Sequence, residues 1–362
     1  MLPSAQLAIF AASVVLFVPM GLAGLHLSRT KMLFFSGIFF IFLFVAVHLA
    51  PYFLSISHLL LASIFFPSPP PYSLLPPSSC LPFLHRISWT HVSDPAWSWD
   101  PSAPVRSCGF QSLSNQDASI LLNGSWILVA GDSQARLLVL ALLRLLLDPT
   151  SLASVEPDLF KRHSDYHIAI ADRGIKIDFL WAPYERNITD LIVRNIQPVP
   201  PYPDVMVLGS GLWHMLHVTN SSNYGESVNN IKEAVFSLHS PVLPHMFWLG
   251  LPTLISSKLN TPEKRERMTD AMLDAYGREV ARTKILRQSG GPLMLLDVRW
   301  LSRGCGAQCT EDGMHYNGVV YNAALQIMLN ALSSLALLSL QELLFFFFFL
   351  VTKLELSSCV HN

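Results

Sequence analysis

The strongest indication of the fold is the segment Trp126-Ile-Leu-Val-Ala-Gly-Asp-Ser-Gln-Ala-Arg136. Its apolar run from Ile127 to Ala130 is typical of a buried strand, and a helical pattern follows from Gln134 to Leu147. Strands that alternate with helices indicate a mostly parallel sheet covered on both faces. The turn Gly131-Asp132-Ser133 therefore places Ser133 at a helix N-terminus, where unpaired backbone N–H groups stabilise negative charge on a substrate oxygen.

The same alternation continues toward the C-terminus. A helix that Thr261 caps, with Pro262 in its first turn, is expected between the last two strands. A long helix over about Tyr316–Leu337 follows them. We predict a three-layer α/β/α domain over residues 106–337. The further strands expected are Tyr166–Ile170 and Ile175–Trp181, which form a hairpin about Arg173-Gly174, and then Asp204–Gly209, Met246–Leu251 and Leu293–Val298.

A second polar motif, Asp312-Gly-Met-His315, lies near the end of this domain. A serine hydroxyl is a weak nucleophile at neutral pH, so it needs a histidine to take its proton and a carboxylate to orient the imidazole. Ser133, His315 and Asp312 supply these three groups, and their spacing puts Asp312 and His315 on one face of a helical turn. The alternatives are a turn at Gly-Asp-Ser, a helix cap at Asp312 and a surface histidine at His315.

Composition predicts a membrane protein. The chain has 362 residues, of which 51% are hydrophobic and 14% charged, and its mean hydropathy is +0.40. The apolar runs Ala5–Leu25 and Met32–Tyr52 are each long enough to span a bilayer, and Arg29 and Lys31 between them favour a cytosolic link. We expect a membrane anchor of one or two transmembrane helices over residues 1–66, a Pro/Ser-rich stem over 67–105 and an atypical hydrophobic tail over 338–362, to which we assign no function.

The cysteines and sequons agree with an oxidising lumen. We expect a disulfide from Cys305 or Cys309 to Cys108, which would pin the loop before Asp312. No metal site is expected, because Cys-x-x-Cys is absent and the pair His163 and His167 has no obvious further ligands. No nucleic-acid partner is expected either, since the net charge is −1 and the basic residues form no stripe. The candidate glycosylation sites are Asn123, Asn187 and Asn220.

Six blocks of sequence resemble the SGNH/GDSL superfamily, specifically its plant branch of wall-polysaccharide O-acetyltransferases, which is related to the trichome birefringence-like family. The resemblance covers roughly residues 5–52 and 106–332. It implies a Golgi membrane protein with a lumenal catalytic domain that O-acetylates xyloglucan and other hemicelluloses. The blocks are GDSQAR from Gly131, LFKRHSDY from Leu159, WAPYE from Trp181, GLWHMLHV from Gly211, KILRQSGGP from Lys284 and CGAQCTEDGMHY from Cys305.

The resemblance also implies an acetyl donor, either acetyl-CoA or an acetylated intermediate, as cosubstrate, with no bound cofactor. The expected partners are a hemicellulose polysaccharide, the membrane and other wall acetyltransferases. Two further functions stay open: a lumenal acetylesterase that trims the same polymers, and a non-catalytic partner in an acetylation complex. At one position where the related wall acetyltransferase has a cysteine, this chain has Trp89. A disulfide at that position is therefore absent or uses Cys80 instead.

Residue roles carried over from the resemblance follow the chemistry above: Ser133 is the nucleophile, His315 the general base and Asp312 its orienter. The asparagine of the superfamily's third block is missing. The oxyanion donors are therefore the Ser133 N–H and Gly209 or Gly211. Arg136 either supplies charge to the site or braces the turn. Trp213 and His214 either form a sugar-facing wall or are packing residues.

Overall fold

A computed structural model of the chain describes residues 77–90, 95–239 and 243–336. Their central feature is a six-stranded sheet of order β4-β5-β3-β6-β7-β8, in which only β4 is antiparallel to its neighbour. The predicted hairpin is present, because β4 and β5 pair across a turn that Gly174 closes at a φ of 62°. The strands are β3 (Trp126–Gly131), β4 (Tyr166–Ile170), β5 (Ile175–Trp181), β6 (Val205–Gly209), β7 (His245–Leu249) and β8 (Met294–Leu296).

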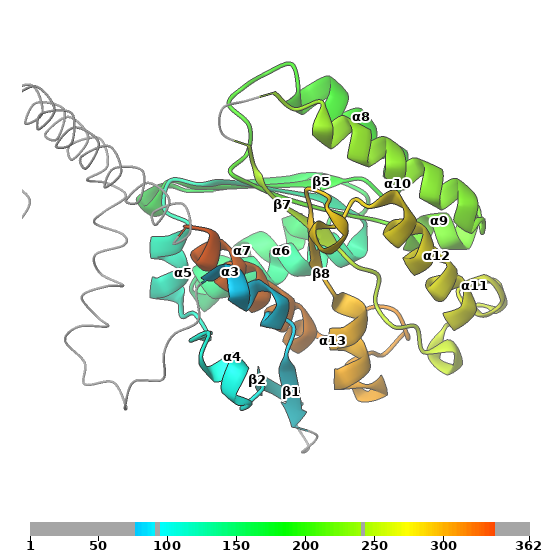
Figure 1. Cartoon of the computed structure of the whole chain (residues 1–362), viewed down its shortest axis with the longest axis horizontal. Coiled ribbons are helices and arrows are strands. Elements are labelled where there is room, and N and C mark those ends of the chain that lie inside the picture. Colours follow the sequence, from blue (N-terminus) through cyan, green and yellow to red (C-terminus); the bar gives the residue numbers. More distant parts are fainter. Residues whose placement is uncertain (1–76, 91–94, 240–242, 337–362) are drawn as a thin grey trace, which may run out of the picture. The chain divides into compact units, whose positions relative to one another are not determined.

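Helices cover both faces of this sheet, which confirms the predicted α/β class with a mostly parallel sheet. Figure 1 shows α8, α10 and α12 on one side and α5, α6 and the C-terminal helix on the other. The main helices are α5 (Asn115–Leu121), α6 (Ser133–Leu146), α7 (Pro149–Leu159), α8 (Glu185–Leu191), α9 (Leu212–His217), α10 (Ser221–Phe236), α11 (Pro262–Arg267), α12 (Asp270–Thr283), α13 (Val298–Cys305) and the C-terminal helix Gly318–Ala336.

The central strands divide the core into two halves because successive side chains point to opposite faces of the sheet. Ile127 and Val129 of β3 pack into the half that contains α6 and the C-terminal helix. Leu128 and Ala130, which alternate with them, pack into the half that contains α8 and α10. A strand buried on both faces needs a continuous apolar run, and for this reason the strand over Ile127–Ala130 could be predicted from the sequence.

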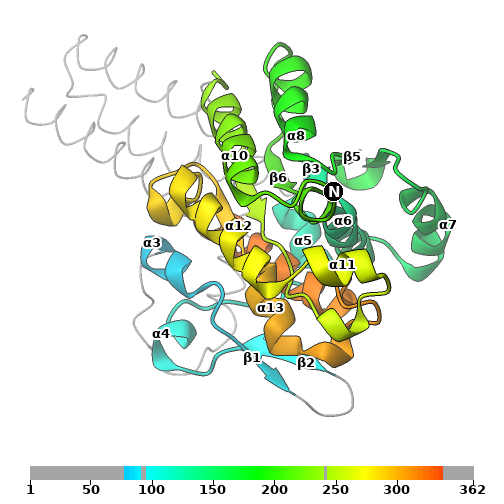
Figure 2. The same ribbon diagram turned by 90° about the vertical axis from the view of Figure 1, so that its right-hand side faces the viewer.

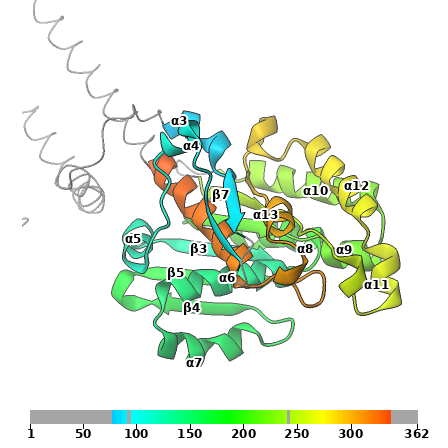
Figure 3. The same ribbon diagram turned by 90° about the horizontal axis from the view of Figure 1, so that it is seen from below.

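The edges of the sheet are equally consistent with the sequence. Figure 3 shows β4 as the outer neighbour of β5, with α7 beyond it.

Thr261 caps α11 as predicted, since its side chain accepts a hydrogen bond from the Lys264 N–H at 3.2 Å and Pro262 begins the helix. Figure 3 shows α11 next to α9, a contact that places Lys264 close to the carboxyl end of β6. Figure 2 shows α12 beside α11.

The segment expected to be a stem is, in its described part, a component of the domain. Residues 77–90 and 95–106 form α3 (Pro77–Cys80), the antiparallel pair β1 (Ile87–Thr90) and β2 (Ala96–Trp99), and α4 (Ala103–Arg106). Leu84 and Ile87 are buried in the same core half as α6. The helices and strands of this segment are only three to four residues long, so they produce no periodic pattern in the sequence, and their packing against the core could not be predicted from it.

The disulfides differ from the predicted pairing. Cys108 bonds Cys80, and Cys305 bonds Cys309. The prediction that Cys108 pairs with Cys305 or Cys309 is therefore wrong. The physical reason for the observed pairing is that the folded segment just described brings the Cα atoms of Cys80 and Cys108 within 5.5 Å of each other, a distance that a disulfide spans.

The predicted membrane anchor at 1–66 and the predicted hydrophobic tail at 338–362 lie outside the described residues. Within the described ranges, the C-terminal helix is the single helix long and apolar enough to cross a bilayer, and 67% of its most apolar window is buried inside the domain. Of the candidate glycosylation sites, Asn123 and Asn220 are exposed. Asn187 is half-buried and accepts a hydrogen bond from the Tyr184 N–H at 3.2 Å.

Candidate active site

Ser133 is the first residue of α6, directly beyond the carboxyl end of β3. The Asp132 side chain caps the helix by accepting a hydrogen bond from the Gln134 N–H at 2.9 Å. Gly131 and Gly209 are register partners at the ends of β3 and β6. A Cβ added to Gly131 would lie 2.1 Å from the Gly209 carbonyl oxygen, so this close approach of the two strand ends requires glycine before the serine.

The structure brings Ser133, His315 and Asp312 together, although Ser133 and His315 are 182 residues apart. The Ser133 Oγ lies 2.7 Å from the His315 Nε2, and the His315 Nδ1 lies 2.6 Å from the Asp312 Oδ2. Both distances are those of short hydrogen bonds. A proton can therefore pass from the serine hydroxyl to the imidazole while the carboxylate fixes the orientation of the ring.

Asp312 and His315 lie in a bend and not in the helical turn that their spacing suggested. The Asp312 Oδ1 accepts hydrogen bonds from the backbone N–H groups of Met314 and His315 at 3.0 and 2.8 Å. The carboxylate thus closes the bend with one oxygen and holds the imidazole with the other. Burial alone would raise the pKa of Asp312, but the hydrogen bonds from the ring and backbone of His315 hold it well below its usual value.

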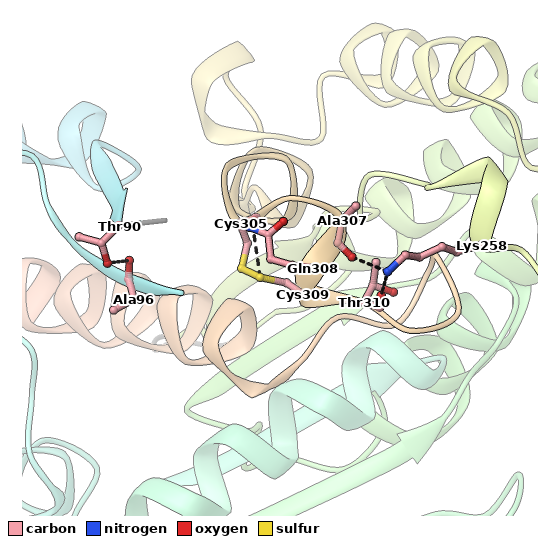
Figure 4. The surroundings of a disulfide bond; sticks show 8 residues. All are labelled: Thr90, Ala96, Lys258, Cys305, Ala307, Gln308, Cys309 and Thr310. Atoms are coloured by element: carbon pink, nitrogen blue, oxygen red, sulfur yellow. Dashed lines mark hydrogen bonds between the residues drawn. A yellow bond between two sulfur atoms is a disulfide. The ribbon is translucent and has the colours of Figure 1, made fainter. Parts of the chain in front are cut away.

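The loop before Asp312 is fastened at several points (Figure 4). The Cys305–Cys309 disulfide closes its first turn. The Lys258 Nζ donates hydrogen bonds to the carbonyl oxygens of Ala307 at 2.8 Å and Thr310 at 2.7 Å. These contacts leave the segment that carries Asp312 and His315 little freedom to move away from Ser133.

A pocket of about 360 Å³ opens above the Ser133 hydroxyl. Trp181 from β5 and Trp213 from α9 form part of its wall, with ring centroids 5.8 Å apart and planes at 86°. His163 stacks on Trp181 at 5.0 Å. The remaining lining residues are Arg136, Phe160, Arg162, Leu212, Leu216, His217, Lys264, Met268, Met314 and His315.

A comparison with known proteins identifies the family of the chain. No family model matches it. It is 46% identical over 367 residues to the protein Altered Xyloglucan 9 of Arabidopsis thaliana, an alignment that covers 92% of this chain and 98% of that protein. The chain belongs to the Altered Xyloglucan 9 family.

Solved structures similar to this family member are more distant. LAE5, an α/β hydrolase enzyme from the metagenome of Lake Arreo, matches 59% of this chain and 97% of its own length, with 16% identity and a TM-score of 0.36. Axe2, an acetylxylan esterase from Geobacillus stearothermophilus, matches 59% of this chain and 95% of its own length, with 12% identity and a TM-score of 0.35.

The other site residues predicted for this Altered Xyloglucan 9 family member separate into two groups. Arg136 and Trp213 line the pocket, and Gly209 and Gly211 lie at the carboxyl end of β6. His214 does not line it. Its ring is buried, with Nδ1 2.5 Å from the Tyr276 hydroxyl and Nε2 2.9 Å from the Asn223 Oδ1. Of the two roles left open for His214, the structure therefore shows packing, and the sugar-facing role is wrong.

Arg136 combines the two alternatives left open for it. Its Nη2 donates to the Ser164 carbonyl oxygen at 3.3 Å, which braces the neighbouring loop. Its guanidinium also lies over the rings of Phe179 and Trp181, at 5.1 and 4.9 Å from their centroids, and faces the pocket.

A buried acidic pair beneath the serine was missed from the sequence. Asp132 and Glu185 are each 1% exposed. Burial raises the pKa of Asp132 to about 6 and that of Glu185 to about 7, and the Ser210 hydroxyl donates to the Glu185 Oε1 at 2.9 Å. The block WAPYE begins at Trp181 and ends at Glu185, so this block was the sequence signal from which these two site residues could have been predicted. The described residues contain no group of three or more His, Cys, Asp or Glu side chains arranged to hold a metal ion.

Proposed function

We propose that the protein is a polysaccharide O-acetyltransferase that works through an acetyl-serine intermediate at Ser133, with its catalytic domain in the Golgi lumen. The observation that carries this proposal is the chain of contacts from the Ser133 Oγ to the His315 Nε2 and from the His315 Nδ1 to Asp312. It is the arrangement that turns a serine hydroxyl into a nucleophile for acyl groups.

In the first half of the proposed reaction, the Ser133 Oγ attacks the acetyl carbonyl carbon as the His315 Nε2 takes the hydroxyl proton. The Asp312 carboxylate stabilises the imidazolium that forms. The Ser133 N–H, at the start of α6, and the backbone of Gly209 or Gly211 supply hydrogen bonds to the developing oxyanion. The proton on His315 then passes to the leaving group, which completes the acetyl-serine.

In the second half, a sugar hydroxyl attacks the acetyl-serine and His315 takes its proton. The pocket suits a sugar, because the indole rings of Trp181 and Trp213 form an aromatic wall beside polar groups. The family relationship supports a xyloglucan-related hemicellulose as acceptor, since the Arabidopsis relative is named for altered xyloglucan. The apolar runs before residue 66 support a membrane anchor.

Water in place of the sugar hydroxyl would make the same triad an acetylesterase, and one experiment separates the functions. Full-length protein is purified in detergent and incubated with an acetyl donor, with and without xyloglucan oligosaccharide. Acetyl bound to the oligosaccharide supports the transferase, and free acetate alone supports the esterase. If neither product forms and Ser133→Ala behaves like the unchanged protein, the protein is a non-catalytic partner and the proposal is refuted.

A further inference from the structure

The charge of the pocket is one-sided. Among its lining residues are three permanent cations, Arg136, Arg162 and Lys264, and no aspartate or glutamate. The whole chain has 24 Lys and Arg against 25 Asp and Glu, so the bias does not follow from composition. The cations also come from separate elements: α6, the loop between α7 and β4, and α11. A neutral sugar carries no negative charge with which these three cations could pair.

Arg136 is the most informative of the three cations. It is only 7% exposed, forms no ion pair with any described residue, and its Nε atom has no hydrogen-bond partner there. Burial lowers its pKa. A buried charge without a counter-ion is costly, and proteins usually pair such charges. An anion bound in the pocket would supply the counter-charge that the guanidinium lacks.

Arg162 and Lys264 are likewise available to a ligand. Within the described ranges neither side chain pairs with a carboxylate, and the Lys264 Nζ bonds only the Asn260 Oδ1, at 3.0 Å. Arg267, on the same helix α11 as Lys264, instead forms an ion pair with Glu263 at 2.9 Å. The nearby carboxylates are already engaged, since Asp312 binds His315 and Asp165 accepts the Trp181 N–H at 2.8 Å.

We infer that this pocket binds an acetyl donor that carries phosphate, and that Arg136, Arg162 and Lys264 contact its negative charge. This inference rests on the proposed function, because it names the donor for the acetylation of Ser133. Arginine and lysine are the side chains that proteins use to bind phosphate oxygens. The phosphate belongs either to a nucleotide thioester such as acetyl-CoA or to an acyl phosphate.

The transfer step balances with either donor. The bond from the acetyl carbon to the Ser133 Oγ forms as the bond to the leaving sulfur or phosphate oxygen breaks. The serine proton passes through the His315 Nε2 to that leaving atom. No oxidant or reductant is needed, and the phosphate itself stays on the leaving group. The cations therefore bind the donor before the transfer and the leaving group after it.

Binding to a form that cannot turn over tests the inference. Full-length Ser133→Ala protein is titrated with coenzyme A and with acetyl phosphate by calorimetry. At least one of the two should bind, with an affinity that falls as salt rises. Adding Arg162→Gln and Lys264→Gln should weaken that binding at least about tenfold. Adding Arg194→Gln, which removes a surface cation paired with Asp190, is the matched control and should not weaken it.

Two results would overturn the inference: neither phosphate compound binds, or the pocket substitutions weaken binding no more than Arg194→Gln does. Binding of an oligogalacturonate in place of both phosphate compounds would also overturn it, since the anion would then be a sugar carboxylate. The proposed function is judged separately with 4-nitrophenyl acetate, a donor without charge. If that ester acetylates Ser133 while no phosphate compound binds, the donor inference fails and the acetyl-serine mechanism stands.

Discussion

Asp312 holds His315 at two points, with Oδ2 at 2.6 Å from the ring Nδ1 and Oδ1 at 2.8 Å from the backbone N–H. The carboxylate therefore sets both the path of the chain and the orientation of the imidazole. The ring tautomer that follows has its proton on Nδ1 and leaves Nε2 free to accept the proton of Ser133. The proposed chemistry depends on this double contact.

Replacing Asp312 with Asn should keep the shape of the bend and remove the negative charge. We expect kcat for acetyl transfer to fall by about 10³ to 10⁴-fold, because the imidazole loses its orientation and the imidazolium its stabilisation. Single-turnover acetylation of Ser133 measures the effect. A variant that retains more than about a tenth of the rate would show that the carboxylate only closes the bend.

Glu185 should make stability depend on pH. Its pKa is raised from 4.5 to about 7 in the folded protein, so the folded state holds the proton more tightly than the unfolded state does. This contribution to stability is complete below pH 4.5 and is lost as the pH rises to about 7. Glu185→Gln cannot ionise and should remove up to about 3 kcal/mol of that pH dependence. Urea unfolding at pH 5 and pH 8 measures it, and parallel pH curves for the two proteins would contradict it.

The two disulfides should have separable effects. Their closed loops differ in length, with sequence separations of 28 for Cys80–Cys108 and 4 for Cys305–Cys309. Loop-closure entropy predicts a loss of roughly 3 to 4 kcal/mol on removing the first and about 2 kcal/mol on removing the second. Only the second lies in the segment that carries Asp312 and His315.

The activity of the two double variants is the discriminating measurement. Cys305→Ser with Cys309→Ser should lower kcat well below that of the intact protein under conditions in which both are folded. Cys80→Ser with Cys108→Ser is the matched control and should keep kcat while lowering the melting temperature. Equal kcat in the two double variants would mean that Lys258 and the bend hold the triad without the sulfur bridge.

Trp213 should matter for the acceptor. Trp213→Ala removes an aromatic wall of the pocket and should raise KM for a xyloglucan oligosaccharide about tenfold, which corresponds to roughly 1.4 kcal/mol of lost contact. Trp300→Ala is the control, because Trp300 lies on α13, is 52% exposed and does not line the pocket. A KM that rises equally in both variants would argue against a sugar-facing role for Trp213.

Structure was predictable from the sequence where a single physical requirement dominated. Strand β3 is buried on both faces, so it needs a continuous apolar run, and Gly131 must be glycine where the Gly209 carbonyl approaches. The pairing of Ser133 with His315 followed from the need of a serine nucleophile for a base and an orienting carboxylate, and the family resemblance implied the same roles. These elements were predictable because each rests on local pattern or topology.

Other features depended on packing that no local pattern reveals. Trp213 and His214 are neighbours on α9, so their side chains point about 100° apart and only one of them faces the pocket. No side-chain cap marks the start of this helix, since Gly211 precedes it, and the sequence suggested a strand end in its place. Residues 77–90 and 95–106 join the domain through short elements and a disulfide, and elements this short produce no detectable periodicity in the sequence.

Acetylation of Ser133 itself is the decisive measurement for the acetyl-serine mechanism. Full-length protein is mixed with acetyl-CoA, acetyl phosphate or 4-nitrophenyl acetate in the absence of a sugar, quenched in acid and digested for mass spectrometry. The acetyl-serine mechanism predicts an acetyl group on Ser133 that disappears when xyloglucan oligosaccharide is added before the quench, and no adduct in Ser133→Ala. Transfer to the oligosaccharide at full rate by Ser133→Ala would contradict it.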